Sequence, residues 1–296
     1  MDLKAYLQER STLVDQALQE IIPAEELYPP KIHQAMHYSV FAGGKRLRPI
    51  LCLAAAEALG KEYQPLLPVA CAIEMIHTYS LIHDDLPVMD DDDYRRGKLT
   101  NHKVYGEGMA VLAGDALLTY AFEILACYGK KHQKQEIAWQ VLREIAVAAG
   151  TEGMIGGQVV DLESAGKNLA DKELLTYIHT HKTGALFRVS LRSGALLAGA
   201  NTEELACLTL YAEKFGLAFQ ITDDLLDIVG DQKKLGKPIG SDIKKNKLTY
   251  PALYGVEKSR CLVREAVIEA IDALTKLSGY TKPLEFMLRY LLEREF

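Results

Sequence analysis

The sequence has few of the features that stabilise secreted proteins or direct them out of the cell. Its five cysteines are an odd number, lie far apart and form no CxxC pair, which argues against a disulfide framework or a zinc site. We interpret them as buried free thiols in a reducing compartment. The N-terminal segment MDLKAYLQERSTLVDQALQE is amphipathic and charged, and it lacks the apolar core of a signal peptide.

Long uninterrupted apolar runs and an excess of basic charge are absent too. The most apolar run, residues 66–83, contains Glu74, His77 and His83, so it predicts a buried core helix rather than a membrane span. The net charge of -6 argues against a surface for nucleic acid or anionic membranes. These absences predict a cytoplasmic protein with no membrane span and no nucleic-acid partner.

The alternating patterns and hairpin dipeptides of β-strands are also missing. Apolar residues instead recur three and four positions apart over most of the chain. We therefore predict an all-α fold: a single domain over residues 1–296, built as a bundle of roughly ten or more helices around a central active-site cavity. Helices are predicted over residues 3–20, 31–42, 48–59, 66–86, 109–128, 135–150, 171–199, 203–229 and 248–274.

Several of these predicted helices are apolar on more than one face, for example residues 184–200. Such helices lie deep in a bundle or at a subunit interface. A homodimer is therefore expected.

The first of two aspartate clusters is the segment HDDLPVMD, residues 83–90, at the end of a predicted apolar helix. Pro87 should end or kink that helix near Leu86, and the turn that follows can bring Asp90 back beside Asp84. The next residues, Asp91–Asp93, are equally compatible with a place in the site and with a solvated or capping role.

The second cluster is the segment QITDDLLD, residues 220–227. On a helix, Asp223 and Asp227 lie about 40° apart, and Asp224 lies about 100° from Asp223. All three carboxylates can therefore face one cavity. A solvated acidic loop is the alternative for either cluster.

Both clusters lie near the C-terminal ends of predicted helices, where the helix dipole and the adjacent like charges disfavour carboxylates. A bound cation offsets both effects. Clusters that offer only oxygen ligands suit Mg²⁺, which commonly bridges protein carboxylates to substrate phosphates.

Segments rich in lysine, arginine and glycine accompany the clusters: GGKRLRP (43–49), RRG (95–97), KTG (182–184) and LGKPIGSD (235–242). Arginine pairs with phosphate oxygens in bidentate fashion, and glycine lets the backbone approach an anion. Each segment alone is more typical of a solvated turn, but together they favour a diphosphate ligand over a bare calcium site. His77 lies two turns before Asp84 and can share the cavity wall, or can be a core histidine.

With these segments in order, the chain resembles the trans-polyprenyl diphosphate synthase family, of the type that includes bacterial farnesyl diphosphate synthases. The resemblance runs over nearly the whole chain. The matching motifs are GGKRLRP (43–49), EMIHTYSLIHDDLPVMDDDDYRRG (74–97), LAGDALL (112–118), GGQVVDL (156–162), HKTGALF (181–187), FQITDDLLD (219–227) and GKPIGSD (236–242).

The resemblance implies a role for each residue that matches a family motif. Three Mg²⁺ ions on the allylic diphosphate would be held by Asp84, Asp85, Asp90, Asp223, Asp224 and Asp227. The diphosphate of isopentenyl diphosphate would be bound by Lys45, Arg48, His77 and Arg96. The allylic diphosphate would be bound by Arg95, Lys182, Lys237 and Lys247. The allylic cation would be stabilised by Thr183, Gln220 and the backbone carbonyl of Lys182, and Gln158 and Asp161 would line the same cavity.

The resemblance further implies a prenyltransferase that joins dimethylallyl or geranyl diphosphate to isopentenyl diphosphate and releases pyrophosphate. In this family an aromatic residue at the position of Tyr79, beside Ser80, together with a two-residue insertion in the first aspartate motif, implies a tunnel floor that stops the product at C15, farnesyl diphosphate. The chain ends LLEREF, without the family's basic C-terminal flap.

Four other readings stay open. They are a synthase for geranylgeranyl diphosphate or another chain length, a class I terpene cyclase, a non-catalytic subunit of a heteromeric prenyl synthase, and an all-α metal phosphohydrolase. A cyclase needs no second diphosphate site, a non-catalytic subunit usually lacks one aspartate motif, and the phosphohydrolases generally use clustered histidines.

Overall fold

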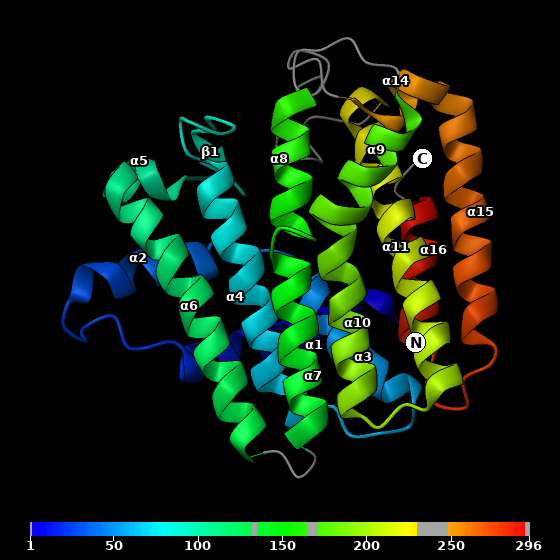
Figure 1. Cartoon of the computed structure of the whole chain (residues 1–296), viewed down its shortest axis with the longest axis horizontal. Helices are drawn as coiled ribbons and strands as arrows, with labels where there is room; N and C mark the ends of the chain where they lie inside the picture. Colours follow the sequence, from blue (N-terminus) through cyan, green and yellow to red (C-terminus); the bar gives the residue numbers. More distant parts are fainter. Residues whose placement is uncertain (1, 132–134, 165–170, 230–247, 294–296) are drawn as a thin grey trace. The chain divides into compact units, whose positions relative to one another are not determined.

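The computed structural model describes residues 2–131, 135–164, 171–229 and 248–293 (Figure 1). These residues form more than ten helices and a single two-stranded hairpin, so the all-α prediction is confirmed for the described part of the chain. They group into two compact units. The N-terminal unit is Asp2–Ile50 with Gln64–Leu142, and the C-terminal unit is Leu51–Tyr63 with the described residues from Arg143 onward. The single domain over residues 1–296 stays a prediction.

The N-terminal unit is built around an interior helix that ends at the first aspartate cluster. In chain order its elements are α1 (Leu3–Ile21), α2 (Pro30–Val40), η1 (Gln64–Leu66), α4 (Leu67–Asp84), β1 (Tyr94–Arg95), β2 (Lys98–Leu99), α5 (Asn101–Tyr105) and α6 (Glu107–Lys131). Helices α3 (Leu47–Ala58) and α7 (Gln135–Ala149) have residues in both units. Helix α4 is buried on nearly every face, and α6 runs alongside it (Figure 1).

A short hairpin follows the first aspartate cluster, although the sequence shows no strand pattern there. Tyr94 pairs with Leu99 and Arg95 with Lys98. The two loop residues, Arg96 and Gly97, both have positive φ angles, of 54° and 77°. This is the backbone of a tight two-residue hairpin loop, which matches the natural twist of antiparallel strands. The hairpin therefore fixes the positions of both arginines.

The C-terminal unit packs its helices around the helix that carries the second aspartate cluster. Its remaining elements are α8 (Met154–Ser164), α9 (Lys172–Ile178), the π-helix η2 (His179–Gly184), α10 (Ala185–Leu197), α11 (Thr202–Val229), α14 (Tyr250–Tyr254), α15 (Val256–Leu274) and α16 (Lys282–Glu293). Helix α11 lies against α10 and α15 (Figure 1). The rings of Phe187, Phe215 and Phe219 contact one another between α10 and α11.

Most predicted helices are confirmed, with three corrections. Helices α5, α8 and α16 were not among the predicted segments. The predicted helix 171–199 is interrupted by η2, and the predicted helix 248–274 is divided at Gly255, whose φ of 78° ends α14. Helix α10, within the predicted helix 184–200, is apolar on several faces because it is buried inside its own unit, so its composition does not indicate a subunit interface.

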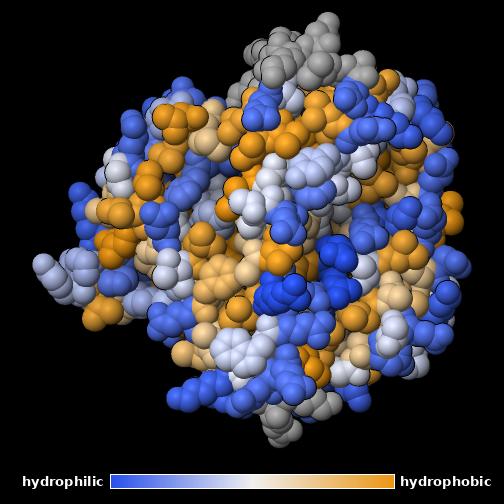
Figure 2. All heavy atoms as spheres, in the orientation of Figure 1, coloured by the Kyte–Doolittle hydropathy of each residue, from blue (hydrophilic) through white to orange (hydrophobic). Residues whose placement is uncertain are grey.

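Among the described residues, two helices are long and apolar enough to cross a membrane by length and composition. The first is residues 64–84, where 67% of the apolar window is buried, as the predicted core helix requires. The second is α6, of which only 33% of the apolar window is buried. Figure 2 shows hydrophobic side chains exposed among polar ones along α6, where Val111 and Leu112 are 40% and 55% exposed. The expected cytoplasmic location stays a prediction.

Candidate active site

The first aspartate cluster lies where α4 ends. The helix stops at Asp84, and the backbone amide of Asp90 donates a 2.8 Å hydrogen bond to the carbonyl of Asp84. The expected turn that returns Asp90 to Asp84 is therefore confirmed. Both side chains are half-buried and partly open to solvent.

Asp85 is more deeply buried than Asp84, and Arg95 holds its carboxylate. Asp85 is 3% exposed, and Nε of Arg95 donates to its two oxygens at 2.7 and 2.9 Å. Burial raises the pKa of Asp85, and the guanidinium of Arg95 opposes that shift. The pair anchors the hairpin to the end of α4. The roles of Asp85 as a metal ligand and of Arg95 as a diphosphate ligand stay predictions.

Arginines surround His77, which lies on α4 two turns before the cluster. Nη1 of Arg48 lies 3.3 Å from Nε2 of His77. Burial first, and then the charges of Arg48, Arg96 and Arg95, hold the pKa of His77 well below its ordinary value. The ring is therefore neutral near pH 7, and it offers a hydrogen-bonding group within a cationic environment.

The hairpin loop brings Arg96 to the glycine segment that precedes α3. Its Nη1 donates to the carbonyl of Gly43. A Cβ atom at Gly44 would lie 2.6 Å from the guanidinium carbon of Arg96, and the φ of Gly44 is 131°. Glycine at this position therefore allows both the backbone turn and the close approach of Arg96.

The structure thus brings together three of the four residues predicted to bind isopentenyl diphosphate: Arg48, His77 and Arg96. Lys45 lies exposed in the same glycine segment. Burial lowers the pKa of Arg48 to about 10 and is opposed by the charge of Glu74, so Arg48 stays charged at neutral pH. This arrangement concentrates positive charge around a neutral imidazole, which suits a diphosphate group.

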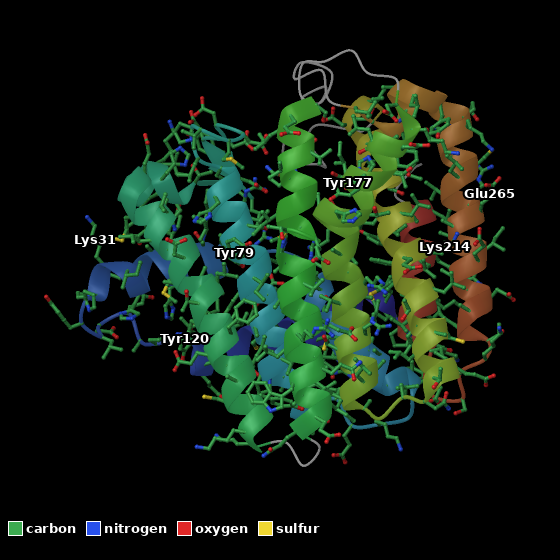
Figure 3. All side chains as sticks on the ribbon, in the orientation of Figure 1. Lys31, Tyr79, Tyr120, Tyr177, Lys214 and Glu265 are labelled. Carbon is green, nitrogen blue, oxygen red and sulfur yellow. The ribbon has the colours of Figure 1, made fainter. Side chains whose placement is uncertain are left out.

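Tyr79 lies on α4 between His77 and the aspartate cluster (Figure 3). It is 5% exposed, its ring packs edge-on against that of His83, and burial raises its pKa to about 12. Within the described part of the chain, its buried hydroxyl has no hydrogen-bond partner. The neighbouring Ser80 donates to the carbonyl of His77 at 2.9 Å. Tyr79 therefore acts as an apolar ring in this environment.

A different group has the spacing of metal ligands. Among the described residues, Asp91, Asp93 and His102 have ligand atoms that all lie within 4.8 Å of one another. Both aspartates are exposed, and Asp93 also forms a 2.7 Å ion pair with Lys103. Asp93 is therefore paired with α5, and the predicted ligands at the end of α4 lie outside this group.

In the C-terminal unit, two of the three residues predicted to stabilise the allylic cation, Lys182 and Thr183, lie on η2, a π-helical turn, and the third, Gln220, lies on α11. π-Helical turns often occur at functional sites because the additional residue reorients side chains. Helix α8 packs closely against this turn at Gly157, where a Cβ atom would lie only 2.1 Å from the backbone nitrogen of Lys182. This contact lets Nζ of Lys182 reach Oδ2 of Asp161 on α8, at 2.6 Å.

A chain of hydrogen bonds links η2 to the second aspartate cluster on α11. Thr183 donates to Oε1 of Gln220 at 3.0 Å, and Nε2 of Gln220 donates to Oδ1 of Asp224 at 2.8 Å. The backbone amide of Tyr250 donates to the other oxygen of Asp224 at 3.0 Å. Thr183 and Gln220, predicted to act together, are therefore in direct contact.

The three aspartates of the second cluster differ in exposure. Asp224 and Asp227 are 3% and 1% exposed, and Asp223 is half-buried. Asp224 is held by donors of its own unit, as Asp85 is held by Arg95. The predicted ligands Lys237 and Lys247, with the motif GKPIGSD, lie outside the described residues.

Sequence reasoning missed several residues at these sites. His179, the first residue of η2, stacks on Tyr250 and lies 3.7 Å from a carboxylate oxygen of Asp224. Burial lowers the pKa of His179 to about 4. Arg46 and Glu74, which pair beneath the glycine segment, were also missed. The only sequence feature that could have placed His179 at the site is its position three residues before Lys182. That spacing is informative only once the π-helical turn is known.

Comparison with known proteins agrees with this arrangement. The family model described as "Polyprenyl synthetase" matches residues 29–278. The chain is 52% identical over 253 residues to the farnesyl diphosphate synthase of Geobacillus stearothermophilus, covering 86% of this chain and 84% of that protein. It is 47% identical over 293 residues to the geranylgeranyl diphosphate synthase of Cyanophora paradoxa, covering 99% and 97%.

A solved structure shares the fold. The crystal structure of an FPP/GFPP synthase from Zymomonas mobilis aligns with a TM-score of 0.87 and 37% sequence identity. The alignment covers 98% of this chain and 99% of that chain. The isoprenoid synthase type of fold expected from the sequence is therefore confirmed.

Proposed function

Because the chain belongs to the polyprenyl synthetase family, we propose that it elongates dimethylallyl and geranyl diphosphate with isopentenyl diphosphate, giving farnesyl diphosphate and pyrophosphate. The observation that carries this proposal is the group of Arg48, His77 and Arg96. A second diphosphate site of this kind is needed by a chain-elongating enzyme and not by a terpene cyclase.

In this proposal Lys45, Arg48 and Arg96 bind the diphosphate of isopentenyl diphosphate by charge, and the neutral ring of His77 completes the site by hydrogen bonding. Arg95 and Lys182 bind the allylic diphosphate, with Lys237 and Lys247 as further ligands. Each of the two described cations is now paired with a carboxylate, Arg95 with Asp85 and Lys182 with Asp161. When the allylic diphosphate binds, Arg95 and Lys182 exchange their carboxylate partners for phosphate oxygens, so each cation keeps a negatively charged partner.

The carboxylates fit Mg²⁺ because the two clusters offer oxygen ligands, and because Asp84, Asp90 and Asp223 are only half-buried. We assign three ions to the clusters Asp84, Asp85, Asp90 and Asp223, Asp224, Asp227. Bound there, Mg²⁺ supplies positive charge that stabilises the departing pyrophosphate.

The chemistry then needs no nucleophilic side chain. The allylic C–O bond breaks, the isopentenyl double bond attacks the allylic cation, and a proton leaves with pyrophosphate as the acceptor. Three oxygens stabilise the developing positive charge of the allylic cation: those of Thr183, Gln220 and the Lys182 carbonyl. The hydrogen bond between Thr183 and Gln220 holds their dipoles in place. Their fixed orientation avoids reorganisation during the reaction.

Product length is assigned to Tyr79, which lies five residues and about 7.5 Å along α4 from Asp84. The buried ring of Tyr79 limits the space available to the growing chain beside α4. A C20 product is the second candidate, because several similar proteins are named geranylgeranyl diphosphate synthases.

The experiment that tests the proposal is chromatography of the products formed from labelled isopentenyl diphosphate, each allylic diphosphate and Mg²⁺. We expect C15 diphosphate, formed only when isopentenyl diphosphate is present. Hydrocarbon from the allylic substrate alone would indicate a cyclase. No turnover by the purified chain, with stimulation of a partner chain, would indicate a non-catalytic subunit.

We also propose a homodimer, and we assign a second copy of this chain to the exposed apolar face of α6. Val111 and Leu112 lie on this face at 40% and 55% exposure, and only a third of the helix's apolar window is buried. Replacement of Leu112 by Glu should give a monomer in sedimentation equilibrium. A monomeric wild-type chain would contradict the assignment.

A further inference from the structure

Arg46 faces inward, unlike the other two cations of the motif GGKRLRP, Lys45 and Arg48. It is 3% exposed, whereas Lys45 is exposed and Arg48 is half-buried. The backbone of Arg46 has a φ of 50°, unusual for a residue with a side chain. This conformation turns the guanidinium beneath the glycine segment instead of toward a ligand.

The guanidinium of Arg46 connects three helices. Nε donates to Asp15 on α1 at 2.8 Å, Nη1 donates to Glu74 on α4 at 2.8 Å, and Nη2 donates to the carbonyl of Val40 at the end of α2 at 2.6 Å. A planar fork with several donors suits such a junction, which the single ammonium group of lysine does not reproduce. The segment between α2 and α3 is thereby fixed at its last residue, Arg46, two positions before Arg48.

The carboxylate of Glu74 supplies negative charge both to Arg46 and to the neighbouring Arg48 and Arg96. Glu74 is 1% exposed and lies one turn before His77 on α4. Oε1 accepts from Arg46, and Oε2 is buried with no hydrogen-bond partner among the described residues. Desolvation lowers the pKa of both Arg48 and Arg96, and the charge of Glu74 opposes that shift in each. One carboxylate therefore acts on three guanidiniums.

We propose that Arg46 and Glu74 are positioning residues of the isopentenyl diphosphate site, an inference that rests on the proposed function. Arg46 fixes the backbone that presents Lys45 and Arg48. Glu74 holds the like-charged arginines together before the ligand arrives. Neither side chain contacts the diphosphate.

The two residues have opposite effects on affinity. Loss of Arg46 releases the segment that presents the ligand-binding cations, which weakens diphosphate binding. Glu74 is a fixed negative charge near a site for a negative ligand, so it lowers affinity at the same time as it organises the arginines. Its conversion to a neutral group of the same shape therefore strengthens binding. A pair that only stabilised the core would weaken binding in both variants.

The test is calorimetric titration of the full chain with isopentenyl diphosphate alone, which does not react without an allylic partner. We expect E74Q to lower the Kd about threefold to tenfold, because glutamine keeps the acceptor for Arg46 and removes the charge. We expect R46M to raise the Kd about tenfold or more, because it removes the fork and leaves Glu74 buried without its partner. The KM for geranyl diphosphate stays within about twofold of wild type in both, since the allylic site is not touched.

Two further variants keep the test informative. R46K retains the charge without the fork and is expected to raise the Kd, even where R46M does not fold. E144Q makes the same substitution in the pair Arg192–Glu144, whose nitrogens and oxygens lie 2.7 and 2.8 Å apart in the C-terminal unit. It is expected to leave the Kd for isopentenyl diphosphate unchanged.

The outcomes separate this inference from the proposed function. Weaker or unchanged binding by E74Q, in a chain whose wild type binds isopentenyl diphosphate and makes product, overturns the positioning role alone. Unchanged binding by both R46M and R46K does the same. A wild-type chain that neither binds isopentenyl diphosphate nor forms product removes the proposed function, and the positioning role with it.

Discussion

Asp85 and Arg95 form a two-pronged ion pair in which Nε of the arginine donates to both carboxylate oxygens, at 2.7 and 2.9 Å. The second aspartate of the other cluster, Asp224, is likewise held by protein donors, from Gln220 and from the backbone of Tyr250. In each cluster the aspartate that comes first, Asp84 or Asp223, is the more exposed. The members of each cluster are therefore expected to contribute differently to activity and to stability.

Replacement of Asp84 and of Asp85 by Asn should separate these contributions. We expect D84N to lower kcat roughly 10²–10³-fold with little change in stability, because a half-buried metal ligand is lost. D85N should lower the free energy of unfolding by roughly 1–3 kcal/mol, because Arg95 loses a charged partner. Steady-state kinetics and urea denaturation measure the two effects. Equal loss of stability in both variants would contradict the distinction.

His77 should take up a proton when isopentenyl diphosphate binds at mildly acidic pH. Burial and the nearby arginines depress its pKa in the free protein, so the ring is neutral there. The diphosphate offsets the charge of the arginines and therefore raises the pKa of His77. Calorimetry at pH 6 in buffers of different ionisation enthalpy measures the uptake.

The matched variant is H77Q, which keeps a hydrogen-bonding side chain and does not titrate. The diphosphate itself can change its protonation on binding, so the difference between wild type and H77Q is the relevant quantity. Identical proton exchange by the two proteins would show that His77 does not titrate on binding.

The fold class and the return of Asp90 to Asp84 were predictable because each follows from local rules. Apolar spacing specifies a helix, and Pro87 cannot continue one. The inward direction of Arg46 was not predictable, because it depends on a backbone φ of 50° and on acceptors from three separate helices. The sequence GGKRLRP presents Arg46 and Arg48 as equivalent cations.

The π-helical turn was unpredictable for a related reason. The segment containing His179 and Lys182 has apolar spacing that also fits an α-helix, and the close approach of Gly157 to the backbone of Lys182 is a tertiary contact that this spacing does not encode. Which of Asp84 and Asp85 is the buried aspartate was likewise unpredictable, because Asp85 is held by Arg95 and Arg95 lies on a hairpin that the sequence did not predict. Local periodicity thus predicted the helices, and tertiary contacts determined which polar residues face inward.

Replacement of Gly157 by Ala should displace η2. The new methyl group would lie 2.1 Å from the backbone nitrogen of Lys182, so the contact between α8 and η2 has to open. We expect at least about a tenfold loss of kcat, because a small misplacement of catalytic groups is costly. The control is G108A on α6, where a Cβ atom meets nothing within 4 Å. G108A should be neutral or stabilising by up to about 1 kcal/mol. Equal kinetics in the two variants would contradict the close approach.

Thiol labelling should distinguish the five cysteines in the folded protein. The prediction that all five are buried is confirmed for Cys52, Cys71 and Cys207 and is wrong for Cys127 and Cys261, which are exposed on the outer faces of α6 and α15. Burial raises the pKa of Cys52 to about 12, so it carries almost no thiolate at pH 8. We expect rapid reaction of Cys127 and Cys261, and reaction of the other three only after urea unfolding. Mass spectrometry of labelled peptides identifies the sites, and rapid native labelling of Cys52 would contradict the packing around α3.

Replacement of Tyr79 by Ala should lengthen the product. The ring is 5% exposed on α4, and its removal opens space beside the helix that carries Asp84. We expect C20 or longer diphosphates from geranyl diphosphate and isopentenyl diphosphate, measured by chromatography of the dephosphorylated products. The matched variant Y79F removes only a buried hydroxyl that has no hydrogen-bond partner among the described residues, so it should still stop at C15 and lose no stability. An unchanged C15 product from Y79A would refute the role of Tyr79, whereas longer products from Y79F as well would assign the length limit to the hydroxyl instead of the ring.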